Sequence, residues 1–158
     1  MPDENQKLKV GIPKETFPNE LRTSIIPENI SRYAKAGCRV LIESGAGEAA
    51  GFTDKQYKDK DAEIIESRDE LFKQADLILQ VRGYGTNPDK GKKDLEKFRK
   101  GQVVVGFFDP LGSPERIREL AKAGVTAFSI ELLPRITRAQ SMDALSSMAT
   151  IGGYKAVL

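Results

Sequence analysis

Short runs of Val, Ile and Leu alternate with longer amphipathic stretches along this chain of 158 residues. The apolar runs are flanked by Gly, Pro, Ser or Asp, as at residues 76–81 and 102–108. Such runs are typical of parallel strands buried on both faces, and the stretches between them carry a helical spacing of apolar residues. The alternation therefore predicts a domain in which strands and helices take turns, and the chain is long enough to give it a core.

The expected fold class is α/β: a mostly parallel open sheet with helices on both faces, of the flavodoxin-like or Rossmann-like kind. We expect strands at residues 9–12, 39–43, 63–65, 76–81, 102–108 and 125–130. We expect helices at residues 27–36, 53–60, 67–74, 93–100 and 113–124, and from about residue 141 to the end. A capping box of Ser67 with Glu70, and Ser113 ahead of Pro114, are expected to open two of these helices.

The composition excludes several classes of function. The chain has 25 Lys and Arg against 23 Asp and Glu, so its net charge of +2 gives no reason to expect nucleic acid as a partner. It has no histidine, which excludes Ser-His-Asp catalysis and the commonest zinc sites, and we expect no metal. The single Cys38 excludes an internal disulfide and favours a reducing compartment. No apolar run is long enough to insert into a membrane.

The segment 45–50, Gly-Ala-Gly-Glu-Ala-Ala, fits the G-x-G-x-x-A pattern of dinucleotide phosphate loops. We reject that interpretation because Glu48 would set a carboxylate against the phosphates. In addition, Thr53 and Asp54 predict that the next helix begins later, so the glycines do not open it. The segment is expected to be a glycine-permitted surface turn. If a dinucleotide binds, the fold that grips its phosphates lies outside these residues.

Charged, amide and hydroxyl side chains are concentrated at residues 133–147, between the last expected strand and the last expected helix. Such a cluster at a strand end usually faces a ligand in α/β proteins. This run, Leu-Pro-Arg-Ile-Thr-Arg-Ala-Gln-Ser-Met-Asp-Ala-Leu-Ser-Ser, resembles the NAD-binding loop of the proton-translocating NAD(P) transhydrogenase alpha subunit. Residues 10–16 with 19–22, and residues 41–47, resemble the N-terminal domain shared by that subunit and alanine dehydrogenase. The run is similar to the transhydrogenases and unlike the alanine dehydrogenases.

The resemblance implies that residues 1–136 form an alanine dehydrogenase/transhydrogenase N-terminal type domain. Residues 137–158 would then be the nicotinamide-site loop and the start of a crossover helix into an NAD-binding Rossmann domain that is absent here. The chain ends inside an apolar helical run, so we expect it to be the beginning of a longer protein. We expect this chain alone to be inactive.

The implied activity is hydride transfer between NAD(H) on this subunit and NADP(H) on a partner domain, coupled to proton translocation. The implied partners are a second copy in a homodimer and the membrane-embedded and NADP-binding transhydrogenase subunits. The implied location is cytoplasmic, peripheral to the inner membrane.

The resemblance maps four residues of the run onto the nicotinamide end of NAD: Arg135, Gln140, Asp143 and Ser146. Arg135 and Ser146 would bind the carboxamide, Gln140 would reach a ribose or the second nicotinamide, and Asp143 would hold Arg135 in place. Arg135, Gln140 and Asp143 are the expected catalytic residues. Simpler roles stay open: a surface ion pair for Arg135 with Asp143, a capping box of Gln140 with Thr137, and an exposed helix serine for Ser146.

Two other functions stay open. An amino-acid dehydrogenase of the alanine type resembles this chain at Arg22, but Arg82 stands where a Lys is expected and Asp109 where a His is expected. Since Asp109 would repel a carboxylate substrate, that activity is disfavoured. Arg22 could instead pair with Glu15 or Glu20, and Asp109 could be only a turn residue. The third possibility is a non-catalytic assembly module.

Overall fold

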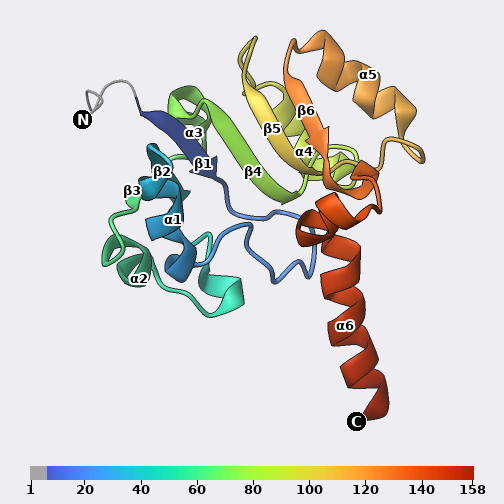
Figure 1. Ribbon diagram of the computed structural model, residues 1–158. Helices are drawn as coiled ribbons and strands as arrows, with labels where there is room; N and C mark the ends of the chain where they lie inside the picture. Colours follow the sequence, from blue (N-terminus) through green and yellow to red (C-terminus); the bar gives the residue numbers. More distant parts are fainter. Residues whose placement is uncertain (1–6) are drawn as a thin grey trace.

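The sheet of the computed structural model, which describes residues 7–158, has six strands in the order β3-β2-β1-β4-β5-β6 (Figure 1). Every neighbouring pair is parallel. The strands are β1 (Leu8–Ile12), β2 (Cys38–Glu43), β3 (Glu63–Ile65), β4 (Leu77–Arg82), β5 (Val103–Phe107) and β6 (Thr126–Ser129). The expected α/β class is confirmed. The order reverses between β1 and β4, and α/β sheets of this kind bind ligands at the carboxyl end of such a reversal.

Helices cover both faces of the sheet, as expected. The α-helices are α1 (Ile30–Lys35), α2 (Asp54–Lys58), α3 (Arg68–Gln74), α4 (Pro88–Leu95), α5 (Pro114–Lys122) and α6 (Ala144–Val157). The 3₁₀ turns are η2 (Pro27–Asn29), η3 (Glu48–Ala50), η4 (Ile130–Leu132) and η5 (Thr137–Met142). Side chains of α3, α4 and α5 pack on one face, and side chains of α1 and α2 pack on the other.

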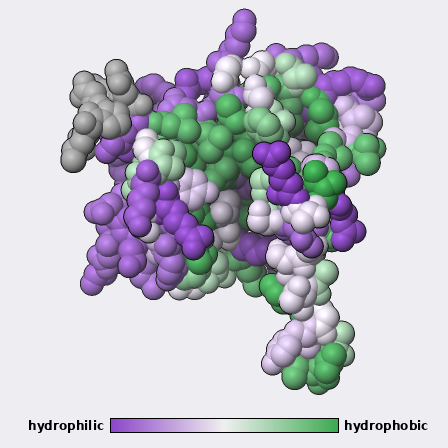
Figure 2. Space-filling view, in the orientation of Figure 1, coloured by the Kyte–Doolittle hydropathy of each residue, from purple (hydrophilic) through white to green (hydrophobic). Residues whose placement is uncertain are grey.

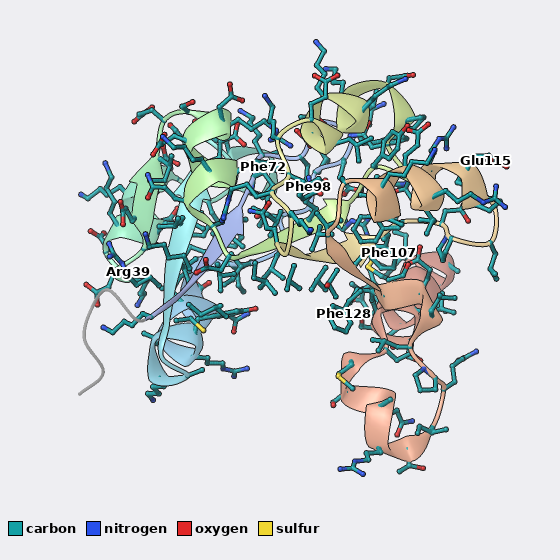
Figure 3. All side chains as sticks on the ribbon, turned by 90° about the horizontal axis from the view of Figure 1, so that it is seen from above. Arg39, Phe72, Phe98, Phe107, Glu115 and Phe128 are labelled. Atoms are coloured by element: carbon teal, nitrogen blue, oxygen red, sulfur yellow. The ribbon has the colours of Figure 1, made fainter. Side chains whose placement is uncertain are left out.

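Each face has its own apolar core. On the α3 side the fully buried Phe72 meets Phe98 edge to face, with ring centroids 5.3 Å apart (Figure 3). On the α1 side the fully buried Tyr57 donates its hydroxyl to the carbonyl of Ile25 at 2.8 Å, so its polar end is satisfied. These two cores hold the strand ends that carry the candidate site.

The helix starts agree only partly with the sequence-based expectations. Ser67 Oγ accepts the backbone N–H of Glu70, but the Glu70 carboxylate accepts from Gln74 instead of completing the expected capping box. Ser113 precedes α5 as predicted, yet its side chain accepts no capping bond from the first turn of backbone. The first turn of the helix expected at 27–36 is 3₁₀, and α1 begins at Ile30.

The helix expected at residues 93–100 is misplaced, because α4 begins earlier and lies at Pro88–Leu95. Its start follows from Pro88, whose ring suits the first helical position. Gly91 lies inside α4 and allows it to pack closely: a Cβ there would lie 2.9 Å from the Cα of Tyr84. Helix α4 therefore approaches the β4–α4 loop closely.

The turn at residues 45–50 follows the sequence interpretation in one respect and departs from it in another. Gly45 has φ +73°, which favours glycine, and α2 begins only after Thr53, which forms a capping box with Gln56. As predicted, the glycines do not open α2, whose N-cap is Thr53; Gly47 instead precedes the 3₁₀ turn η3. They are buried, however, not on the surface: a Cβ on Gly47 would lie 2.5 Å from the ring of Tyr57.

Helix α6 buries no residue and extends away from the sheet (Figure 1). It begins later than expected, at Ala144, because the 3₁₀ turn η5 occupies residues 137–142. Apolar side chains gather on the sheet face that neighbours it and again near its far end (Figure 2). Phe128 on β6 and Leu145 and Ile151 on α6 are all more than half exposed.

Candidate functional site

A pocket of about 400 Å³ lies where the carboxyl ends of β4 and β5 meet the start of α6. We call it the arginine pocket, since Arg22, Arg82 and Arg135 all line it. Its other walls are mostly apolar, with Phe107 and Leu133 among them. Because the sheet order reverses between β1 and β4, the segment after β1 and the end of β4 meet here.

Two of the three arginines are held by one carboxylate. Glu20 Oε1 accepts from Arg22 Nε at 2.7 Å, and Glu20 Oε2 accepts from Arg22 Nη2 at 2.7 Å and from Arg82 Nε at 2.8 Å. The Glu20 side chain is only 5% exposed. These hydrogen bonds, those of Arg22 above all, lower the pKa of Glu20 to about 2 although burial opposes them. Glu20 is therefore an ionised partner throughout the physiological range.

A second carboxylate holds the backbone at the end of β4. Glu15 accepts the N–H groups of Val81 at 2.6 Å and Arg82 at 3.1 Å. The pairing of β4 with β5 shifts register between Leu79 and Arg82, so these N–H groups lie at an irregularity in the ladder. Burial raises the pKa of Glu15, while the two backbone hydrogen bonds oppose the rise.

The four residues selected from the 133–147 run come together. Arg135, Gln140, Asp143 and Ser146 all line a second, polar pocket of about 420 Å³. Arg135 and Asp143 also line the arginine pocket, so the two pockets adjoin. The run folds as the 3₁₀ turn η5 followed by the start of α6, which brings residues 135 and 146 to one place.

Asp143 is the polar centre of this run. Its Oδ1 accepts the backbone N–H groups of Leu145 and Ser146, which makes it the N-cap of α6. Its Oδ2 accepts the hydroxyl of Ser146 at 2.7 Å and lies 3.6 Å from Nε of Arg135. Hydrogen bonds from Ser146 lower the pKa of Asp143. The ion pair of Arg135 with Asp143 is thus present, and Asp143 has a helix-capping role that the sequence analysis did not assign.

The simpler roles weighed for the other candidates have mixed outcomes. Thr137 begins η5 but does not cap it, so the capping box with Gln140 is not formed. Arg22 pairs with Glu20, as the structural alternative held. Asp109 does not line the arginine pocket; its φ is +49° and its carboxylate accepts the N–H of Gly112, as a turn residue does.

Two functional candidates were missed. Glu20 was weighed only as a partner of Arg22, and its contact with Arg82 required the strand order. Glu131 lines the arginine pocket, where its carboxylate accepts the N–H groups of Phe108 and Asp109 at the end of β5. In the sequence, each of the two is a single Glu that follows a strand. That pattern is too common to identify a functional residue.

Among residues 7–158, no group of His, Cys, Asp and Glu side chains is arranged to hold a metal ion. Within the same residues, no helix has the length and apolar character that crossing a bilayer requires.

Residues 11–152 match the family model described as the alanine dehydrogenase/PNT, N-terminal domain. The NAD(P) transhydrogenase subunit alpha of Cereibacter sphaeroides is 39% identical over 151 residues, which are 96% of this chain and 28% of that protein. The NAD(P) transhydrogenase subunit alpha of Haemophilus influenzae is 32% identical over 149 residues, which are 94% of this chain and 28% of that protein.

Among solved structures, the transhydrogenase of Sinorhizobium meliloti superimposes with a TM-score of 0.84 at 39% identity, covering 94% of this chain and 42% of that one. The chain thus spans less than half the length of each of these similar proteins.

Proposed function

Because the chain belongs to the alanine dehydrogenase/PNT N-terminal domain family, we propose that it supplies one wall of an NAD(H) site in a transhydrogenase alpha subunit. The reaction of the whole enzyme is then hydride transfer between NAD(H) at this site and NADP(H) on a partner domain. One observation carries the proposal: Arg135, Gln140, Asp143 and Ser146 line one polar pocket that adjoins the arginine pocket.

The donor set fits a nicotinamide carboxamide, which needs both donors and acceptors. Arg135 offers N–H groups, Ser146 a hydroxyl, and Gln140 both kinds of atom. Asp143, the N-cap of α6, pairs with the Arg135 side chain. A neutral amide suits this place because the charge of Arg135 is already opposed by the carboxylate of Asp143, 3.6 Å away.

The adjoining apolar walls suit the flat ring that carries the carboxamide. Phe107, Leu133 and Leu145 line the arginine pocket and would exclude water from a bound ring. Hydride transfer between two nicotinamides requires that the two rings approach closely and that water is excluded from them. It needs no acid or base. The absence of histidine from the chain is compatible with that chemistry.

The whole-enzyme properties belong to the same proposal. Residues 1–136 are the N-terminal domain proper, and residues 137–158 are the site loop and the start of the crossover into an NAD-binding domain. The chain acts in a homodimer, together with membrane-embedded and NADP-binding transhydrogenase subunits that couple hydride transfer to proton movement. It lies on the cytoplasmic side, peripheral to the inner membrane.

A chimera tests the activity. The matching segment of the Cereibacter sphaeroides alpha subunit is replaced by this chain, and reduction of an NADP analogue by NADH is measured in membranes. We expect transhydrogenation to continue, and to fall when Arg135 or Gln140 is changed. A folded, assembled chimera without activity would argue for the assembly module, and turnover of alanine would argue for the amino-acid dehydrogenase.

A further inference from the structure

The segment between β1 and η2 encloses the side chain of Arg82 on several sides. Glu20 accepts from its Nε, and the ring of Phe17 lies under its guanidinium with 4.3 Å between Cζ and the ring centroid. Glu15 from the same segment accepts the Arg82 backbone N–H. The contacts with Glu20 and Phe17 fix the direction of this guanidinium, and the contact with Glu15 fixes the backbone that carries it.

A tight turn presents Phe17 and Glu20 together. The N–H of Glu20 donates to the carbonyl of Phe17 at 3.1 Å, and the two residues between them are Pro18 and Asn19. Asn19 has φ +62°, and Pro followed by a left-handed Asn is the pattern of a type II turn. The turn sets the Phe17 ring beneath Arg82 and the Glu20 carboxylate beside it.

Glu20 leaves part of each guanidinium free. Arg22 uses Nε and Nη2 on Glu20, and Arg82 uses Nε. Within residues 7–158, Nη1 of Arg22 and both Nη atoms of Arg82 donate no hydrogen bond. Both side chains line the arginine pocket and are only about a third exposed, at 39% for Arg22 and 34% for Arg82. Partly buried N–H groups that lack a partner are suited to an oxygen acceptor on a ligand.

We propose that Glu20 is a positioning residue, which fixes Arg22 and Arg82 so that their free Nη groups donate to an oxygen of the ligand bound in the arginine pocket. The proposal rests on the proposed function, in which NAD(H) is that ligand. Glu20 does not touch the ligand; it acts through the two arginines. One carboxylate sets two donors at once, so its loss misaligns both.

The test is NADH binding to the chimeric alpha subunit described above, followed by NMR through the amide signals of Gln140 and Ser146 and the Nε–H signals of the arginines. We expect Glu20→Gln to weaken NADH binding roughly tenfold, because an amide cannot accept from four N–H groups as the carboxylate does. The Nε–H of Arg22 should also exchange faster with water. Glu63→Gln is the matched control, since Glu63 makes a 2.7 Å ion pair with Arg39 away from the pocket.

A double-mutant cycle separates positioning from a merely structural role. If Glu20 acts through the arginines, adding Glu20→Gln to an Arg22→Gln, Arg82→Gln protein should cause no further loss of NADH affinity. A loss that is additive, or an unchanged affinity in Glu20→Gln alone, overturns the positioning proposal and leaves the proposed function standing. If NADH shifts no signal of the assembled chimera, the proposed function fails, and this proposal with it.

Discussion

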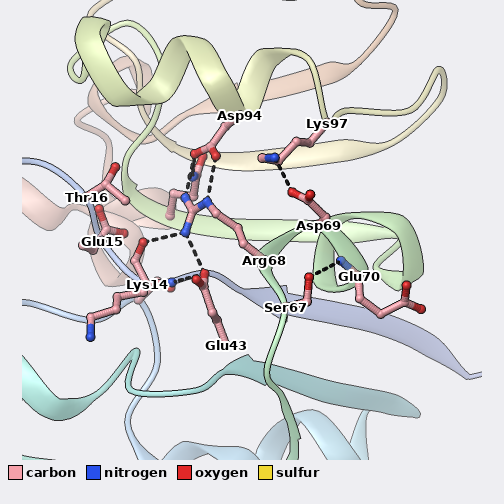
Figure 4. A network of polar contacts seen from close by, with 12 residues as sticks. Lys14, Glu15, Thr16, Glu43, Ser67, Arg68, Asp69, Glu70, Asp94 and Lys97 are labelled. Atoms are coloured by element: carbon pink, nitrogen blue, oxygen red, sulfur yellow. Dashed lines mark hydrogen bonds and ion pairs between the residues drawn. The ribbon is translucent and has the colours of Figure 1, made fainter.

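Arg68 and Asp94 face each other with two parallel hydrogen bonds, Nε to Oδ1 at 2.7 Å and Nη2 to Oδ2 at 2.6 Å (Figure 4). The remaining Nη1 of Arg68 donates to the carbonyl of Lys14 and to the carboxylate of Glu43. Arg68 therefore joins α3 to α4, to the end of β2 and to the segment that leaves β1. That segment continues to Glu20, so the network anchors one side of the candidate site.

Replacing Asp94 should be costly. Its side chain is 5% exposed and also accepts from Gln80, so Asp94→Ala would leave Arg68 as a buried charge with half of its partners gone. We expect a loss of about 3–5 kcal/mol in the free energy of unfolding, measured by urea denaturation. Asp69→Ala is the control: Asp69 pairs with Lys97 but is 74% exposed, and should cost less than about 1 kcal/mol. Equal losses would show that the Arg68 network is no stronger than a surface pair.

Most strands could be predicted because they are short apolar runs, such as 103–107, which a parallel sheet covers. The edge strand β6 is the exception to their burial, because its residues Thr126–Ser129 are largely exposed. The position of helix α4 could not be predicted. Gly91 lies in this helix because it packs closely against Tyr84, and that contact cannot be inferred from the neighbouring sequence. The same division applies to the candidate site. Arg135 and Ser146 are near in sequence and were found together, whereas Glu20 meets Arg82 only through the strand order.

Lowering the pH should reduce the free energy of unfolding because Glu20 becomes protonated. Its pKa falls from 4.5 to about 2 on folding, so its contribution is complete above the unfolded value and is lost as the pH drops from about 4.5 toward 2. That contribution is on the order of 3 kcal/mol. Glu15 has the opposite sign, because its raised pKa means that protonation favours the folded state.

The quantity to measure is therefore the difference in unfolding free energy between the parent and Glu20→Gln, from pH 7 down to pH 3. Subtraction removes the part of the Glu15 effect that does not depend on Glu20, whose charge is a lesser cause of the raised Glu15 pKa than burial is. We expect the difference to be constant above about pH 5 and to shrink below it. A difference that did not depend on pH would contradict the depressed pKa of Glu20.

Two glycine substitutions should have opposite effects. Gly152 lies inside α6 with nothing within 4 Å of a Cβ, so Gly152→Ala should stabilise that helix by about 1 kcal/mol. At Gly85 a Cβ would lie 1.5 Å from the carbonyl oxygen of Phe108, so Gly85→Ala should destabilise the whole domain. Helical ellipticity at 20 °C and thermal unfolding measure both. A destabilising Gly152→Ala would mean that α6 has a close partner in solution.

Arg135→Gln should separate binding from stability. The Arg135 side chain is 71% exposed, so the substitution should change the unfolding free energy by less than about 0.5 kcal/mol. NADH binding, followed by NMR titration, should weaken roughly tenfold if Arg135 donates to the carboxamide. Arg138→Gln is the matched control, because this neighbouring exposed arginine lines neither pocket. If the two variants bind NADH with the same affinity, Arg135 is not part of the binding site.

Asp143 combines a cap with a charge, and two substitutions separate them. Asp143→Asn keeps a side-chain oxygen for the N–H groups of Leu145 and Ser146, so α6 should keep its hydrogen-exchange protection. The same variant removes the ion pair with Arg135 and should weaken NADH binding. Asp143→Ala should lose both properties, with faster amide exchange in the first turn of α6. If Asp143→Asn binds NADH as the parent does while Asp143→Ala does not, the residue serves the site only by starting the helix, and its charge has no part in holding Arg135.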